Sequence, residues 1–286
     1  MPDTGPVCGK LQGAVRTLVR PAKPILPLYF GPPDEPLFGC YHEPPAGHRR
    51  KCAVLICPPI GHEYVNCHRA LRQLSARLAE AGFPVLRFDY YGCGDSAGIS
   101  EEGRVSRWLE DISTAIFDLR QRTGLAQTCI VGLRLGGALS TMIGSQRDDV
   151  ESMVLWSPVV NGKSYLENLF SLQKEMLRFR PKPKRKHAQD HIDVLGFPLS
   201  RFLRGELEKI DLLTVTEKPA KNILLIQSDE GDGQSSLNGR LSRTEARLES
   251  QCFEAPQIWL PTADGSLLVP SQVLQSIVAW VGKTHS

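Results

Sequence analysis

The stretch CIVGLRLGGAL, residues 129–139, constrains the fold of this chain more than any other segment. A strand-like apolar run, Cys129 to Val131, leads directly into a run of small residues that favours a helix. Gly132 and Gly136 permit a tight turn at the junction, because glycine has no side chain to crowd the backbone. A strand that turns at once into a helix is the repeating unit of parallel sheets, so this segment predicts an α/β architecture.

The same alternation continues along most of the chain. Strands are predicted within 51–59, 83–92, 129–133, 150–160, 221–230 and 256–262, and helices within 68–82, 104–122, 136–146 and 266–282. Two short apolar runs, 26–31 and 37–44, flank a proline-rich turn and predict a hairpin. The pattern predicts a mostly parallel central sheet with helices on both faces.

Three parts of the chain differ in character. Residues 1–24 read as a loosely held N-terminal arm, and residues 25–160 together with 219–286 carry the α/β alternation. Residues 161–218 interrupt it with charged helical pieces and no clear strand, which predicts an inserted cap. Within the cap, the amphipathic stretch 165–179 is expected to roof a pocket, and the basic run 180–187 to be a solvated loop.

Composition excludes several classes of function. A net charge of +3 is too small to indicate nucleic-acid binding, and no apolar run is long enough to span a membrane. The N-terminal residues contain no apolar block of signal-peptide length, so we expect a cytoplasmic protein. The eight cysteines have no repeating interval, which favours reduced thiols. The group Cys57, His62, Cys67 and His68 fits no common ligand spacing, so neither a metal nor another cofactor is expected.

The block CPPIGHEYVNCHRALRQLSARLAEAGFPVLRFDYYGCGDSAG, residues 57–98, resembles the α/β-hydrolase superfamily. It contains a strand, a loop, a helix, a strand and a GxGDSxG loop in that family's order. The nearest branch is that of serine-aminopeptidase-like and exosortase-associated hydrolases, and the resemblance extends over most of the chain from about residue 25. It implies an α/β-hydrolase fold with a cap. It also implies that the turn after residues 129–133 is the nucleophile elbow of such an enzyme.

The resemblance allows each position of a catalytic triad to be checked. The nucleophile position holds Arg134, and a guanidinium has no lone pair with which to attack a carbonyl. The acid position holds Asp229, which follows an apolar strand. A histidine is expected soon after 256–262, but Asp264 or Gly265 stands there instead. With nucleophile and base both replaced, the ordinary triad is not expected to work.

Two other residues are weaker nucleophile candidates. A literal G-x-S-x-G occurs at 94–98, with Ser96 in the middle. No strand leads directly into this motif and no helix leads out, so Ser96 is expected to stabilise a turn. Cys93 in the same loop would attack only if a cationic neighbour lowered its pKa.

Five residues are candidates for a pocket that binds an acyl or anionic ligand: Arg134, Leu135, Gly61, His62 and Asp264. Gly61 and His62 lie in the expected oxyanion loop, where His62 either hydrogen-bonds backbone or orients a carbonyl. Arg134 has two interpretations that remain open. It forms an ion pair with Asp229 or Asp264, or it binds a carboxylate or phosphate at a helix N-terminus.

The residues favour a non-catalytic accessory protein that binds a small acyl or anionic molecule. Two alternatives remain at this point. The first is a divergent hydrolase of an ester, thioester or amide, and the second is a structural partner that assembles through its cap. Whether the chain is an enzyme is therefore left open by its sequence.

Overall fold

The computed structural model describes residues 25–178, 191–227, 233–262 and 264–286. The predicted N-terminal arm, the basic run 180–187 and Asp229 lie outside these ranges. The strands are β1 (Leu26–Phe30), β2 (Leu37–His42), β3 (Cys52–Cys57), β4 (Val85–Phe88), β5 (Gln127–Leu133), β6 (Ser152–Trp156), β7 (His191–Val194), β8 (Phe197–Ser200), β9 (Asn222–Gln227) and β10 (Arg247–Cys252). The helices are α1 (Gly61–Glu80), α2 (Val105–Thr123), α3 (Leu135–Gly144), α4 (Gly162–Leu177), α5 (Arg201–Leu207), α6 (Gln234–Leu241) and α7 (Ser271–Thr284), with short 3₁₀ turns η1 (Ser100–Glu102) and η2 (Leu212–Thr214).

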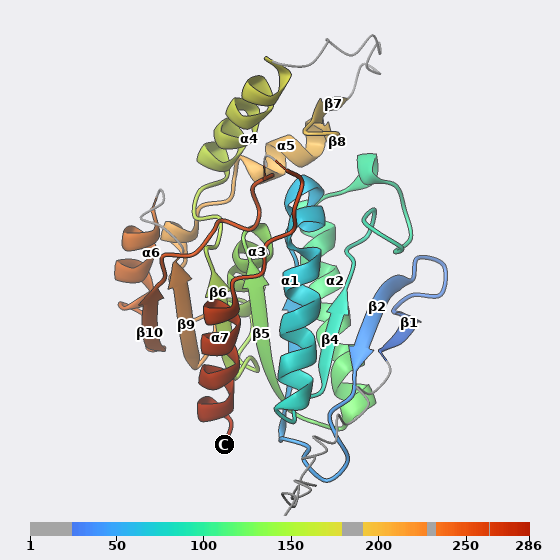
Figure 1. Cartoon of the computed structure of the whole chain (residues 1–286), viewed down its shortest axis with the longest axis vertical. Coiled ribbons are helices and arrows are strands. Elements are labelled where there is room, and N and C mark those ends of the chain that lie inside the picture. The colour runs from blue at the N-terminus through green and yellow to red at the C-terminus, as the bar shows by residue number, and fades with distance from the viewer. Residues whose placement is uncertain (1–24, 179–190, 228–232, 263) are drawn as a thin grey trace, which may run out of the picture.

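The described strands form an eight-stranded sheet in the order β1-β2-β4-β3-β5-β6-β9-β10 (Figure 1). β2 pairs antiparallel with β1 and with β4, and every other pairing in this sheet is parallel. The predicted hairpin is therefore confirmed as β1 and β2, and the mostly parallel α/β sheet is confirmed as well.

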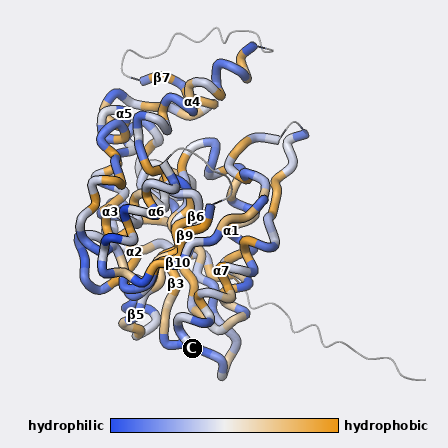
Figure 2. Tube along the Cα trace, turned by 90° about the vertical axis from the view of Figure 1, so that its left-hand side faces the viewer, coloured by the Kyte–Doolittle hydropathy of each residue, from blue (hydrophilic) through white to orange (hydrophobic). Residues whose placement is uncertain are grey.

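Helices cover both faces of the sheet because its central strands are apolar on both sides. In β3, Val54 and Ile56 pack in the same core as residues of α1 and α7, whereas Ala53 and Leu55 pack with residues of α2 and α3. Successive side chains of a strand point to opposite faces, so one continuous apolar run supplies both cores. Figure 2 shows this apolar interior as orange tube along the central strands.

The prediction of the last strand was wrong. The last strand is β10 at the sheet edge, where four of its six residues are exposed and two are half-buried, so they form no apolar run. The apolar residues of 256–262 lie in a loop, in which Ile258 and Trp259 are buried. Their burial packs this loop onto the core that contains α1 and α7. An apolar run here marks a buried loop and not a strand.

Between β6 and β9 the chain forms α4, the two-stranded β7–β8 hairpin and α5. We call these elements the α4–α5 segment; the hairpin within it was not predicted from the sequence. The segment stands beyond the carboxyl ends of the central strands (Figure 1). Ligands of open α/β sheets bind at these strand ends, so the segment overhangs the expected place for a site.

Candidate functional site

The turn between β5 and α3 has the backbone of a nucleophile elbow, and Arg134 stands at its tip. Arg134 has φ 53° and ψ −121°, a strained conformation for a residue with a side chain. A Cβ at Gly136 would overlap the carbonyl oxygen of Cys57, so glycine is required where the turn meets β3. The sharp turn therefore holds the Arg134 side chain at the carboxyl end of the sheet.

The guanidinium of Arg134 is held from several sides. Its Nε donates to Oε1 of Glu63 at 3.0 Å, and an Nη donates to the carbonyl oxygen of Ser157 at 3.3 Å. The guanidinium carbon lies 4.8 Å from the ring centroid of Trp259 and 5.9 Å from that of Tyr165. These aromatic faces attract the guanidinium cation, and they also exclude water from it.

The described ion pair of Arg134 is made with a residue that was not predicted as its partner. Asp229 lies outside the described residues, and Asp264 is exposed and accepts a hydrogen bond from the backbone N–H of Ser266 at 3.0 Å. The ion pair is made with Glu63, whose side chain is 2% exposed, against 18% for Arg134. An exposed carboxylate is well solvated, whereas a buried one requires a cation, which explains the preference for Glu63.

Glu63 also joins the sheet to the α4–α5 segment. It lies in the first turn of α1, and its Oε2 accepts a hydrogen bond of 3.1 Å from the hydroxyl of Tyr165 in α4. Burial and the charge of Glu63 raise the pKa of Tyr165 well above its ordinary value, so the phenol stays protonated and donates. Burial alone would lower the pKa of Arg134, but the Glu63 carboxylate outweighs it and the pKa is raised.

Sequence reasoning missed Glu63, although a signal for it exists. The buried face of α1 runs through Cys67, Leu71, Leu74 and Leu78, and four residues before Cys67 it reaches Glu63. A carboxylate on an apolar helical stripe must find a cation or a donor in the core. No comparable signal in the sequence indicates that Tyr165 and Trp259 lie beside Arg134 and Glu63.

Beside Arg134 lies a cavity of about 130 Å³ between the sheet and the α4–α5 segment. Its described lining consists of Arg134, Ser157, Pro158, Val159, Val160, Asn161, Ser164, Tyr165, Asn168, Gln234, Gln257 and Trp259. Among these residues, Arg134 carries the one full charge, and the others are mainly amides, hydroxyls and aromatic rings. An engineered apolar cavity of about 150 Å³ holds benzene, so this volume suits a small head group.

The remaining pocket candidates fall outside this lining. Gly61 and His62 form the start of α1 and not a loop, and burial lowers the pKa of His62. Leu135 is fully buried as the first residue of α3. Asp264 stays in its exposed loop. Of the five predicted residues, the structure places Arg134 at the cavity and gives the other four no part in its wall.

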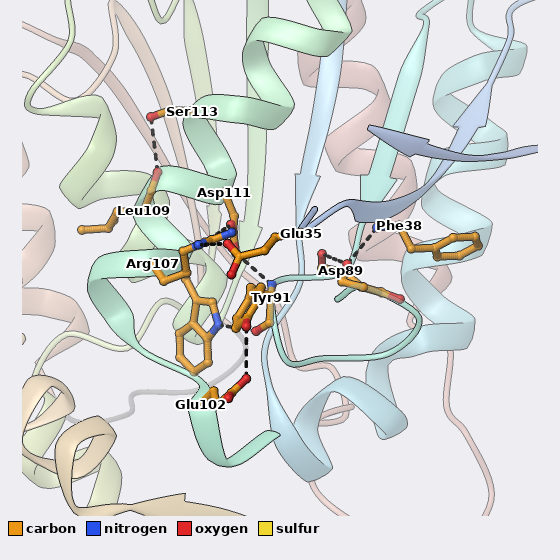
Figure 3. Close-up of polar contacts among 11 residues, drawn as sticks. Glu35, Phe38, Asp89, Tyr91, Glu102, Arg107, Leu109, Asp111 and Ser113 are labelled. Carbon is orange, nitrogen blue, oxygen red and sulfur yellow. Dashed lines mark hydrogen bonds and ion pairs between the residues drawn. The ribbon is translucent and has the colours of Figure 1, made fainter. Parts of the chain in front are cut away.

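Ser96 and Cys93 hold together the loop that follows β4. The Ser96 hydroxyl donates to the carbonyl oxygen of Asp89 at 2.6 Å and accepts from the N–H of Phe38 at 2.8 Å (Figure 3). Burial raises the pKa of Cys93 to about 12, so its thiol stays protonated. Ser96 is thus a turn residue, as expected, and Cys93 is not an activated thiolate.

No described group of three or more His, Cys, Asp or Glu side chains is arranged to hold a metal ion. Within the described ranges, none of the helices has the length and apolar character that crossing a bilayer requires.

Comparisons with known proteins agree with this architecture. The family model described as serine aminopeptidase, S33, matches residues 51–200. Est1E from Butyrivibrio proteoclasticus, solved with ferulic acid, is 17% identical over 90% of this chain and 96% of its own, with a TM-score of 0.60. An esterase from Pyrococcus furiosus is 15% identical over 91% of this chain and 90% of its own, with a TM-score of 0.62.

A proline iminopeptidase from Mycobacterium smegmatis is 12% identical over 90% of this chain and 97% of its own, with a TM-score of 0.60. At such identities the solved structures share the fold with this chain and nothing finer. No curated protein matches the sequence.

Proposed function

The chain belongs to the serine aminopeptidase S33 family of α/β hydrolases, and we propose that within it the protein binds a small acyl or anionic molecule without cleaving it. The observation that carries this proposal is Arg134 at the tip of the β5–α3 turn, with its guanidinium beside the cavity. A guanidinium cannot act as a nucleophile, but it is well suited to hydrogen-bond a carbonyl or carboxylate oxygen.

The position of His285 supports the loss of catalysis. Its Nε2 lies 2.7 Å from the hydroxyl of Ser152, the first residue of β6. Arg134 follows the last residue of the parallel strand β5, so the two side chains lie at opposite ends of the sheet. His285 therefore cannot serve as a base at the elbow, and a triad needs its base within hydrogen-bond reach of the nucleophile.

We also propose which residues form a cap and where in the cell the protein is located. We assign residues 161–218 to a cap over a core of 25–160 and 219–286, because Tyr165 of α4 closes over the Arg134–Glu63 pair. The seven described cysteines are all free, which supports a reducing, cytoplasmic location.

The alternative is a divergent hydrolase, which the enzymes among the structural neighbours favour. Treatment of the full chain with a fluorophosphonate probe and with p-nitrophenyl esters separates the two. We expect no labelled serine and no turnover above the solvent rate. A labelled serine, or ester hydrolysis that an Arg134→Met substitution abolishes, would reject the non-catalytic role.

Binding is tested on the same protein. Small carbonyl and carboxylate compounds are expected to shift the Arg134 Nε–H resonance in nuclear magnetic resonance titrations, and Arg134→Met should weaken their binding about tenfold or more. The exposed Arg204, paired with Glu208 at 2.9 Å, provides a matched control in Arg204→Met. Equal binding by wild type and Arg134→Met would exclude this cavity as the site.

A further inference from the structure

A groove runs along one face of α4, apart from the Arg134 cavity. It consists of two cavities, of about 390 Å³ and 270 Å³, which meet at Phe170, and we call it the α4 groove. The described lining of its larger cavity is Phe170, Gln173, Lys174, Leu177 and Arg178. The described linings of the α4 groove and of the Arg134 cavity share no residue. The α4–α5 segment, which stands beyond the sheet in Figure 1, thus has a second hollow of its own.

The period of α4 explains why these side chains line one groove. Residues three or four apart on a helix lie on the same face. One face of α4 therefore carries Lys163, Glu167, Phe170, Lys174 and Leu177. The neighbouring helix α5 contributes Arg204, whose guanidinium carbon lies 5.7 Å from the ring centroid of Phe170. The α4 groove is thus formed by side chains of both helices.

The α4 groove is apolar between its ends. Leu166 is almost completely buried, Phe170 is partly buried against the same core, and Leu177 is 38% exposed. Covering the accessible surface of these side chains with an alkyl chain is favourable, because apolar surface then leaves water. An apolar chain therefore matches the middle of the groove.

The two ends of the α4 groove differ in charge. At one end the described lining carries two cations and two acids, which balance: Lys163, Arg204, Glu167 and Glu208. At the other end, Lys174 and Arg178 are exposed and make no ion pair with any described residue. No acid belongs to the described lining of that end. An anionic group placed there would have two cations with which to form charge-assisted hydrogen bonds.

An anion and an apolar chain are needed in one molecule to match both features. An anion without a chain would leave the apolar lining in water, and a chain with a cationic head would be repelled by Lys174 and Arg178. Lys174 and Leu166 are separated by roughly 12 Å along the axis of α4, so the chain must be long enough to span this distance.

We propose that the α4 groove binds a free single-chain amphiphile with an anionic head group, of the fatty-acid class. The carboxylate pairs with Lys174 and Arg178, and the alkyl chain covers Leu177 and Phe170 and extends towards Leu166. Because the groove shares no described lining residue with the Arg134 cavity, its occupancy does not depend on the proposed function.

Three probes separate the contributions of head and chain: decanoate, decyltrimethylammonium and acetate. Decanoate has both features, decyltrimethylammonium has a long alkyl chain with a cationic head, and acetate has the anion without the chain. Titrated below the micelle concentration into the isotope-labelled full chain, decanoate should shift the backbone amide resonances of Phe170, Lys174 and Leu177 in a saturable manner. It should bind about tenfold or more tightly than either other probe.

Substitution of both free cations tests the head-group site. Lys174→Gln combined with Arg178→Gln should weaken decanoate binding about tenfold or more and should not weaken binding of decyltrimethylammonium. Both side chains are exposed, so the variant should fold as wild type does. The matched control is Arg201→Gln combined with Lys209→Gln, which removes two exposed cations of the same segment outside the groove lining.

Four outcomes would overturn the proposal. Acetate or decyltrimethylammonium could bind as tightly as decanoate, or the control pair could lose as much affinity for decanoate as the variant of Lys174 and Arg178. Decanoate could shift only the Arg134 Nε–H resonance, which would place it in the Arg134 cavity and support the proposed function instead. Finally, the protein could bind vesicles of phosphatidylcholine and phosphatidylglycerol but no free decanoate, which would make this face a membrane-binding surface.

Discussion

At the scale of single residues, the site is organised by one ion pair. Arg134 has a strained backbone, and Glu63 is almost completely buried. Each would be unfavourable alone, since a buried charge without a partner is costly. Their pairing explains how an elbow can present arginine where the fold usually presents a small nucleophile. The pair also leaves further guanidinium donors beside the cavity.

The pair predicts a large stability effect. Arg134→Met leaves Glu63 buried without its cation and should lower the free energy of unfolding by about 3–5 kcal/mol. Urea denaturation measures this loss. Arg204→Met, at an exposed pair on α5, should cost about 0–1 kcal/mol. A loss at Arg134 no larger than that of Arg204 would contradict a buried pair.

Adding Glu63→Gln to Arg134→Met should restore part of the lost stability. The neutral amide no longer needs the cation, and it can still accept from the Tyr165 hydroxyl. Strictly additive losses in the double variant would show that the two residues do not act as a pair.

At the scale of elements, α5 closes the N-terminus of α2. Glu206 of α5 accepts from the backbone N–H of Val105 at 2.7 Å and from the hydroxyl of Ser106 at 2.9 Å. The first N–H groups of a helix have no partner within it and carry the positive end of its dipole. Glu206 thus supplies a cap from a distant part of the chain and ties the α4–α5 segment to the core.

Glu206→Ala should therefore loosen this attachment. We expect a loss of about 1–2 kcal/mol, the range for removing a helix cap, with faster amide hydrogen exchange at Val105 and Ser106. Glu167→Ala, at an exposed acid on α4, is the control. Unchanged exchange at Val105 in the Glu206 variant would show that the cap contributes nothing.

At the scale of the whole molecule, the fold could be predicted and the contacts of the site could not. Strands buried on both faces, such as 52–57, are apolar at every position, so a continuous apolar run in the sequence reveals them. The edge strand β10 is polar and exposed, and sequence gives it no such signal. The β7–β8 hairpin was missed because its four-residue strands are partly exposed.

In the site, as in the fold, only the residue with a local sequence signature could be predicted. Arg134 could be located because a glycine-flanked turn has a local signature. Glu63, Tyr165, Gln234 and Trp259 come from four distant segments, which meet only after the sheet, α6 and the α4–α5 segment have packed. Local patterns carry no information about such meetings. Of the two expected partners of Arg134, Asp264 was therefore wrong, and Asp229 lies outside the described residues.

Burial of titratable groups also makes the stability of the fold depend on pH, and His42 at the end of β2 contributes to this dependence in acid. Burial, reinforced by the charges of Arg87 and Arg72, lowers the pKa of His42 to about 4. The unfolded chain binds a proton near pH 6.5, the ordinary histidine value, so stability is complete above that pH and falls as the pH drops towards 4. The full loss is at most about 3 kcal/mol.

Asp111 opposes this trend. Burial, only partly offset by hydrogen bonds from the N–H of Tyr91 and from Arg107 (Figure 3), raises its pKa to about 6. The folded chain therefore binds this proton first, and stability rises as the pH falls from 6 to the ordinary value of 3.8. The two residues have opposite slopes between pH 6 and 4, so the wild-type curve is flatter than either residue alone would give.

His42→Gln separates the two effects. Without the histidine, the fall in stability below pH 6.5 disappears and the rise from Asp111 remains, so the variant should gain stability relative to wild type as the pH falls to 4. Urea midpoints measured across this range test the change, with His48→Gln at an exposed histidine as the control. A difference between His42→Gln and wild type that stays constant with pH would mean that the buried imidazole does not remain neutral in the folded protein.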